Sequence, residues 1–190
     1  MWKFSLFGTA NLINENVTRL GLVSYLGELT KEGVMQAEKV SHDDRLKGAE
    51  LIVSSPFTRA LQTGAIISKN TGIPLTVEPA FHEWLADCAH TQTLDNEYSK
   101  LAYKEFCENN FELAPSSNLR FESVNQIVAR AYPAMMKYLE MGYSKIIVTT
   151  HAMLMRTMGY QKQKIPYCTI FERDFDENSK FERFVAWKGK

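Results

Sequence analysis

The stretch Ser-Ser-Pro-Phe-Thr-Arg-Ala-Leu-Gln-Thr, residues 54–63, decides the fold because it joins a strand to a helix. The run Glu-Leu-Ile-Val at residues 50–53 predicts a short buried strand before it. Ser55 followed by Pro56 is typical of a helix start, since proline suits the first helical position. Apolar residues then recur at helical spacing to about Asn70, which predicts a helix.

The same alternation of short apolar runs and longer helical patterns continues along the chain. Further strands are predicted at Trp2–Phe7, Leu75–Val77 and Lys145–Thr150. Further helices are predicted at residues 30 to about 47, 96–109, 124–139 and 153–160. The tail, residues 167–187, reads as a hairpin with a polar turn near residues 176–179.

Two of these helices carry more detailed predictions. In the helix that starts after Thr30, we expect Val34, Ala37 and Val40 or Ser41 on the inner face. In the long helix from residue 124, Pro133 is expected to kink or split the helix, because proline lacks a backbone N–H.

Strand–helix alternation predicts an α/β fold, a three-layer α/β/α sandwich with a mostly parallel sheet. The C-terminal hairpin would add an antiparallel edge. We expect a single domain over residues 1–190, with a variable insertion at about residues 78–119 over the site. Ligands of such sheets bind beyond the carboxyl ends of the strands. This rule brings together Phe7-Gly8, Ser54-Ser55 and Thr150-His151.

Composition excludes several functions. The 22 basic and 22 acidic residues balance, so no net field recruits nucleic acid or an anionic membrane. No apolar stretch approaches the roughly 20 residues that a membrane span needs. The three cysteines, Cys88, Cys107 and Cys168, have neither metal-ligand nor disulfide-scaffold spacing. We therefore expect a cytoplasmic protein with free thiols, no metal and no cofactor; homo-oligomer formation stays open.

Motifs spread over nearly the whole length give the chain a resemblance to the histidine phosphatase superfamily, the phosphoglycerate-mutase-like fold. Residues 29–37 match the family's LTxxGxxQA pattern, and residues 54–63 match SSPxxRAxQT at every specified position. Residues 149–152, Thr-Thr-His-Ala, resemble its VSHG. Glu122-Ser123 with Arg130 resembles its GES entry to a long helix, with Phe121 in place of the glycine.

The resemblance implies a phosphoryl-transfer site. In the family, a histidine in an Arg-His-Gly tripeptide on the first strand attacks phosphorus, while arginines and a second histidine hold the phosphoryl oxygens. Carried over by position, Arg59 and His151 are expected to bind phosphate. Glu83 is the expected acid, and His151 with Glu83 would carry any residual catalysis.

The first strand departs from this pattern. The register puts Leu6 at the first phosphate arginine, Phe7 at the nucleophile and Ile13 at a phosphate-binding asparagine. A phenyl ring has no lone pair for phosphorus, and an isobutyl group supplies no charge. Loss of a nucleophile costs on the order of a millionfold in turnover. Loss of one charged hydrogen-bond donor costs roughly 1.5–3 kcal/mol in the free energy of anion binding.

Several other residues are expected to have structural roles and no part in catalysis. His82 adjoins Glu83 and is expected to be a solvated loop histidine. Arg156 is expected to form a structural ion pair, and Arg130 is expected to pack or to form a salt bridge. The methionines of residues 153–158 are expected to pack in the core or on the helix surface.

Three functions stay open. The first is an inactive or very weak histidine-phosphatase homologue that binds a phosphorylated small molecule, inorganic phosphate or a protein partner. The second is an active phosphomonoesterase that uses His151 with Glu83. The third is a protein-interaction module without ligand or chemistry.

Overall fold

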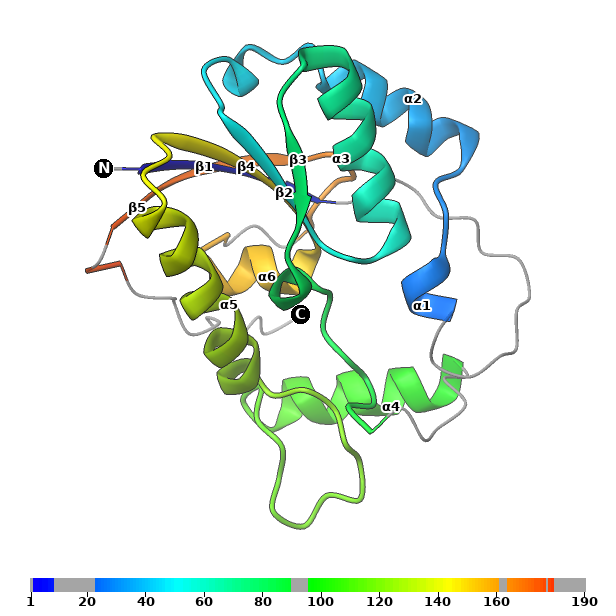
Figure 1. Cartoon of the computed structure of the whole chain (residues 1–190). Helices are drawn as coiled ribbons and strands as arrows, with labels where there is room; N and C mark the ends of the chain where they lie inside the picture. Colours follow the sequence, from blue (N-terminus) through cyan, green and yellow to red (C-terminus); the bar gives the residue numbers. More distant parts are fainter. Residues whose placement is uncertain (1, 9–22, 90–95, 161–163, 177, 180–190) are drawn as a thin grey trace.

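A five-stranded sheet forms the centre of the computed structural model, in which residues 2–8, 23–89, 96–160, 164–176 and 178–179 are described (Figure 1). The strand order is β3-β2-β4-β1-β5. The first four of these strands run parallel, and β5 pairs antiparallel with β1. Their bounds are β1 Trp2–Gly8, β2 Leu51–Ser54, β3 Leu75–Val77, β4 Lys145–Thr150 and β5 Ile170–Phe175.

Helices cover both faces of this sheet, α2 and α3 on one and α5 and α6 on the other (Figure 1). The three-layer α/β/α arrangement with an antiparallel edge is therefore confirmed, while the second arm of the expected hairpin lies outside the described residues. The helices are α1 Val23–Leu26, α2 Lys31–Val40, α3 Thr58–Thr71, α4 Asn96–Glu108, α5 Val124–Glu140 and α6 Ala152–Thr157, with 3₁₀ turns η1 Asp44–Leu46 and η2 Pro79–Phe81.

The core follows from the alternation of side chains along the central strands. Ile52 of β2 and Ile147 of β4 pack with Ile67 of α3 on one face of the sheet. Their neighbours Val53 and Val148 pack on the other face, with apolar residues of α5. Because successive strand residues point to opposite faces, a fully apolar strand is buried on both sides. These strands are therefore fixed in place, and their ends form a rigid platform.

The helix after Thr30 is shorter than predicted, and its inner face differs. It ends at Val40 rather than near Lys47, and the chain then turns into η1. The buried residues of α2 are Gly33, Ala37 and Val40, whereas Val34 is 39% exposed. The expectation for Val34 was wrong because a glycine occupies the contact position one residue earlier, and α2 packs there against α3.

Two further helix predictions need correction. Helix α3 begins at Thr58 rather than Pro56, because the backbone of Phe57 is still extended. Helix α5 is not split: it runs continuously past Pro133, which lies on its exposed face. Buried residues on the opposite face, among them Ala131, Ala134 and Met135, hold the helix to the sheet. This packing outweighs the loss of one backbone hydrogen bond.

Helix α6 covers residues 152–157 instead of the expected 153–160. Gly159 follows it with a φ of 97°, a left-handed conformation that glycine adopts easily and that ends a helix. Met153, Met155 and Met158 are all buried, so these methionines lie in the core. Within the described part of the chain, no helix has the length and apolar character that crossing a membrane demands.

Candidate functional site

The carboxyl ends of the central strands converge, as the sequence predicts. Gly8 pairs with Thr150, and Ser54 pairs with Thr149. The backbone N–H of Ser55 also donates to the carbonyl of Thr149 at 2.9 Å. The backbone of Phe7 pairs with Thr149, two residues before His151. Loops that leave these three strands therefore begin at one edge of the sheet.

His151 occupies the position between β4 and α6 and is completely buried. Its Nε2 lies 2.7 Å from Oγ of Ser55. The same Oγ accepts a hydrogen bond from the backbone N–H of Phe57 at 3.2 Å. Nδ1 of His151 is buried and has no hydrogen-bond partner among the described residues. One nitrogen of the imidazole is thus held by Ser55, and the described segments offer no partner to the other.

Burial keeps His151 uncharged. The pKa of its imidazole is well below the usual range, mainly because burial disfavours the charged form and also because Arg59 is nearby. A neutral imidazole presents one N–H donor and one lone pair, so the position of its single proton decides its chemistry.

Arg59 lies in the first turn of α3 and is 7% exposed. Its guanidinium carbon stands 5.0 Å from the ring centroid of Phe57, in a cation–π arrangement. Burial lowers the pKa of Arg59, and the charge of Glu83 opposes that shift. The structure therefore brings Arg59 into the electrostatic environment of both Glu83 and His151.

Glu83 follows η2 in the chain and lies half-buried beside the first turn of α6. Its Oε1 accepts hydrogen bonds from the backbone N–H groups of Trp84 at 2.9 Å and Met153 at 3.3 Å. Burial nevertheless raises the pKa of this carboxyl, against the opposing effects of the Trp84 N–H and the charge of Arg59. Glu83 therefore holds a proton to higher pH than an exposed glutamate does.

An aromatic cluster completes the site. The buried ring of Phe57 lies 4.4 Å from that of Tyr25, 5.0 Å from His151 and 6.2 Å from His82, centroid to centroid. His82 is half-buried, with Nδ1 2.7 Å from the carbonyl of Glu83. The expectation of a solvated histidine was therefore wrong, since His82 stacks nearly parallel to Phe57.

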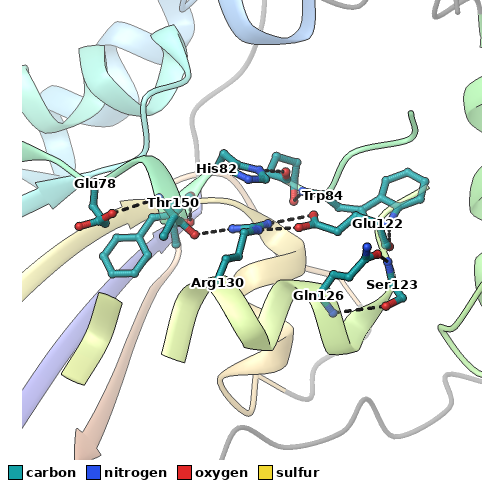
Figure 2. Close-up of polar contacts among 11 residues, drawn as sticks. Glu78, His82, Trp84, Glu122, Ser123, Gln126, Arg130 and Thr150 are labelled. Carbon is teal, nitrogen blue, oxygen red and sulfur yellow. Dashed lines mark hydrogen bonds and ion pairs between the residues drawn. The ribbon is translucent and has the colours of Figure 1, made fainter. Parts of the chain in front are cut away.

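Arg130 anchors the loop that carries Glu83. Its Nε and Nη2 donate to the two carboxylate oxygens of Glu122 at 2.6 and 3.0 Å, and its Nη1 donates to the carbonyl of Ala80 (Figure 2). The indole Nε1 of Trp84 donates to the backbone carbonyl of Glu122 at 2.6 Å. The Arg130 side chain is 16% exposed and that of Glu122 is 5% exposed. The predicted ion-pairing role of Arg130 is confirmed.

The structure thus brings together three of the expected site residues, Arg59, Glu83 and His151. Leu6 and Phe7 lie at the end of β1 by their backbone, and Ile13 lies outside the described residues. Sequence reasoning missed the contact of Ser55 with His151, although Ser55 belongs to the motif at residues 54–63. Within the described part of the chain, no three His, Cys, Asp or Glu side chains are grouped to hold a metal.

Solved structures of similar fold are phosphatases or hydrolases in several cases. YhfR of Bacillus stearothermophilus matches with a TM-score of 0.73 at 17% identity, covering 98% of this chain and 97% of its own. Mycobacterial glucosyl-3-phosphoglycerate phosphatase, solved with inorganic phosphate, matches at 0.63 and 18%, covering 82% and 76%. The α-ribazole phosphatase of Shigella flexneri matches at 0.62 and 16%, with the same coverage of 82% and 76%.

At these identities the solved structures show a shared fold. No curated protein is similar enough in sequence to count as a match. The sequence model of the histidine phosphatase superfamily (branch 1), however, matches residues 27–184, which is most of the chain. Together with the strand order and the converging strand ends, this match identifies the family: the chain belongs to the histidine phosphatase superfamily.

Proposed function

We propose that this chain is a non-catalytic, or nearly inactive, histidine-phosphatase homologue that binds a phosphate group at the strand-end site. The observation that carries the proposal is the pair Leu6 and Phe7 at the end of β1, where the family pattern has arginine and the histidine nucleophile. Neither side chain supplies a lone pair for phosphorus or a charge for its oxygens. The binding half of the proposal is supported by buried Arg59 and by Nδ1 of His151, for which the described residues provide no hydrogen-bond partner.

The charges of the site favour a weakly bound anion. Arg59 contributes a buried positive charge near Glu83 and His151, whereas the charge of Arg130 is compensated by Glu122. His151 is neutral, and Glu83 brings a negative charge when it is ionised. A phosphate dianion beside one arginine and an ionised glutamate is poorly balanced. The ligand class that fits is therefore a small phosphomonoester or inorganic phosphate, bound together with a proton on Glu83.

The first prediction concerns Arg59. The unaltered protein is expected to hydrolyse an aryl phosphate no faster than a reagent blank and to bind phosphate or sulfate measurably by isothermal titration calorimetry. Arg59→Met should weaken that binding about ten- to hundredfold, because a charged hydrogen-bonding arm is lost. Arg45→Met is the matched control, since Arg45 is an exposed arginine of η1 that is paired with Asp43 and precedes the amino end of β2.

Each half of the proposal has its own contradicting result. Metal-independent turnover that disappears in Arg59→Met and in His151→Gln would refute inactivity. Equal sulfate affinity in Arg59→Met and Arg45→Met would refute the binding site. A protein that is folded but binds no anion would favour the interaction-module reading instead.

The second prediction concerns pH and Glu83. A bound anion stabilises the protonated carboxyl, so binding is linked to proton uptake, and affinity should fall as pH rises from mildly acidic values through the raised pKa of Glu83. Sulfate is the suitable probe, because it does not itself titrate in this range. Glu83→Gln should bind sulfate about tenfold more tightly at pH 8 and show little pH dependence. Calorimetry in buffers of different ionisation enthalpy counts the protons directly.

The control for this measurement is Glu50→Gln. It makes the same change of charge just before the amino end of β2, opposite to the strand ends that form the site. Glu50 there accepts hydrogen bonds from Ser144. Its sulfate affinity should follow the pH dependence of the unaltered protein. Proton uptake that persists in Glu83→Gln would show that another group is responsible.

A second candidate function is a phosphomonoesterase in which His151 attacks phosphorus or activates water, with Glu83 as the acid. The raised pKa of Glu83 favours it, because a protonated carboxyl can donate to a leaving alkoxide. Rapid quench with labelled substrate tests the covalent version. If no acid-labile phosphoenzyme forms during turnover, His151 is not a nucleophile.

A further inference from the structure

We infer that Ser55 is a positioning residue that holds neutral His151 in the tautomer with its proton on Nδ1. In this tautomer His151 offers an anion a hydrogen-bond donor and no lone pair. The inference about the tautomer stands on the contacts of Ser55 and on the complete burial of His151. The use of Nδ1–H toward a phosphate oxygen rests on the proposed function.

The contacts of the Ser55 hydroxyl carry the argument. Its oxygen accepts from the backbone N–H of Phe57 at 3.2 Å and lies 2.7 Å from Nε2 of His151. The neighbouring Ser54 hydroxyl donates to the backbone carbonyl of Ser55 and not to its side chain. The hydroxyl thus has one proton to give, and among the described residues Nε2 is the acceptor within reach.

The two tautomers of His151 leave different numbers of buried groups unsatisfied. With the proton on Nδ1, Ser55 donates to the lone pair of Nε2, and within the described part of the chain only the Nδ1–H remains without a partner. With the proton on Nε2, that N–H donates to Ser55, so the serine hydroxyl proton and the Nδ1 lone pair are both left unpaired. Because an unmade hydrogen bond in a buried site is costly, the first tautomer is favoured.

The consequence is a restriction on the chemistry of the site. A protonated Nδ1 has no in-plane lone pair with which to attack phosphorus, and the lone pair of Nε2 is occupied by Ser55. A donor at Nδ1 suits an oxygen acceptor such as a phosphate or sulfate oxygen. Ser55 therefore favours anion binding by His151 over nucleophilic attack.

The experiment is a long-range ¹H–¹⁵N correlation spectrum of the uniformly labelled full chain at neutral pH, which distinguishes protonated from unprotonated ring nitrogens. His151 should show Nδ1 as the protonated nitrogen at a population ratio of roughly tenfold or more, although free histidine in water prefers Nε2–H. Ser55→Ala should shift the tautomer toward Nε2–H, and Ser55→Thr, which retains the hydroxyl, should restore Nδ1–H.

Ser54→Ala is the matched control, because it removes a buried hydroxyl one residue away that donates to the backbone carbonyl of Ser55; its spectrum should keep the Nδ1–H tautomer. An Nε2–H tautomer in the unaltered protein would overturn the inference, even if the Ser55 variants fail to fold. An unchanged Nδ1–H tautomer in folded Ser55→Ala would also overturn it.

Addition of sulfate then separates the inference from the proposed function. Movement of the His151 Nδ1 resonance on titration supports the anion-donor role. If sulfate leaves that resonance unmoved while the tautomer changes with Ser55 as expected, the proposed anion site fails and the positioning role of Ser55 holds.

Discussion

Replacing Leu6 with Arg and Phe7 with His in one chain is expected to raise aryl-phosphate turnover by roughly a thousandfold or more over the unaltered protein. The two changes restore an attacking imidazole and a second cation at the end of β1. The backbone of Phe7 pairs with Thr149, so a histidine there begins its side chain at the same sheet edge as His151. The rate is measured as initial velocity with a chromogenic phosphate.

The size of the gain follows from how catalytic groups cooperate. Removal of the nucleophile from a group of cooperating catalytic residues lowers turnover on the order of a millionfold. The other residues assist the nucleophile's attack, so they contribute little without it. Arg59, Glu83 and His151 are already assembled in the site, so part of that factor is recoverable. Full recovery is not expected, because Ile13 also departs from the family pattern, at the position of a phosphate-binding asparagine.

The single variants and one knockout define the controls. Leu6→Arg alone should stay inactive, since it supplies no nucleophile. Phe7→His alone should raise turnover less than the double variant does, since it lacks the arginine that would bind the phosphoryl oxygens. In the double variant, His151→Gln should remove most of the new rate. A double variant that is folded and silent would mean that the loss extends to other positions, such as Ile13 or Ala152.

The sequence was sufficient to predict the position of a residue where a local motif ties that residue to the end of a strand or the start of a helix. The motif at residues 54–63 ties Arg59 to the first turn of a helix that follows a strand, and parallel strands end at one edge. The convergence of Arg59 and His151 at that edge could therefore be predicted. The hairpin pattern of the tail separately predicted an antiparallel edge strand, which is β5.

The remaining features depend on contacts between distant segments. Tyr25 reaches Phe57 from α1, and Ser55 meets His151 across 96 residues of sequence. No periodicity or spacing encodes such pairs. Pro133 shows the complementary limit: a local rule allows the helix to break there, but burial of the opposite helix face keeps α5 continuous. Tertiary packing decided against the local preference in that case.

Arg130→Met is expected to lower the free energy of unfolding by about 3–5 kcal/mol, the usual cost of breaking a buried ion pair from one side. The change leaves Glu122, whose side chain is 5% exposed, without its bidentate partner. It also removes the donor to the carbonyl of Ala80, in the loop that leads to Glu83. Urea unfolding followed by tryptophan fluorescence measures the effect, with Trp84 beside the pair as a local reporter.

Two further variants show whether the cost comes from burial of an unpaired charge. Glu122→Leu combined with Arg130→Met removes both charges and should recover much of the loss, because paired apolar replacements of buried ions are often close to neutral. Lys104→Met removes one partner of the Lys104–Glu108 pair, whose side chains are 68% and 66% exposed, and should cost no more than about 1 kcal/mol. If Arg130→Met costs as little as Lys104→Met, the pair with Glu122 does not stabilise the loop that carries Glu83. If the double variant is less stable than Arg130→Met alone, the contacts of Glu122 itself, and not its unpaired charge, determine the loss.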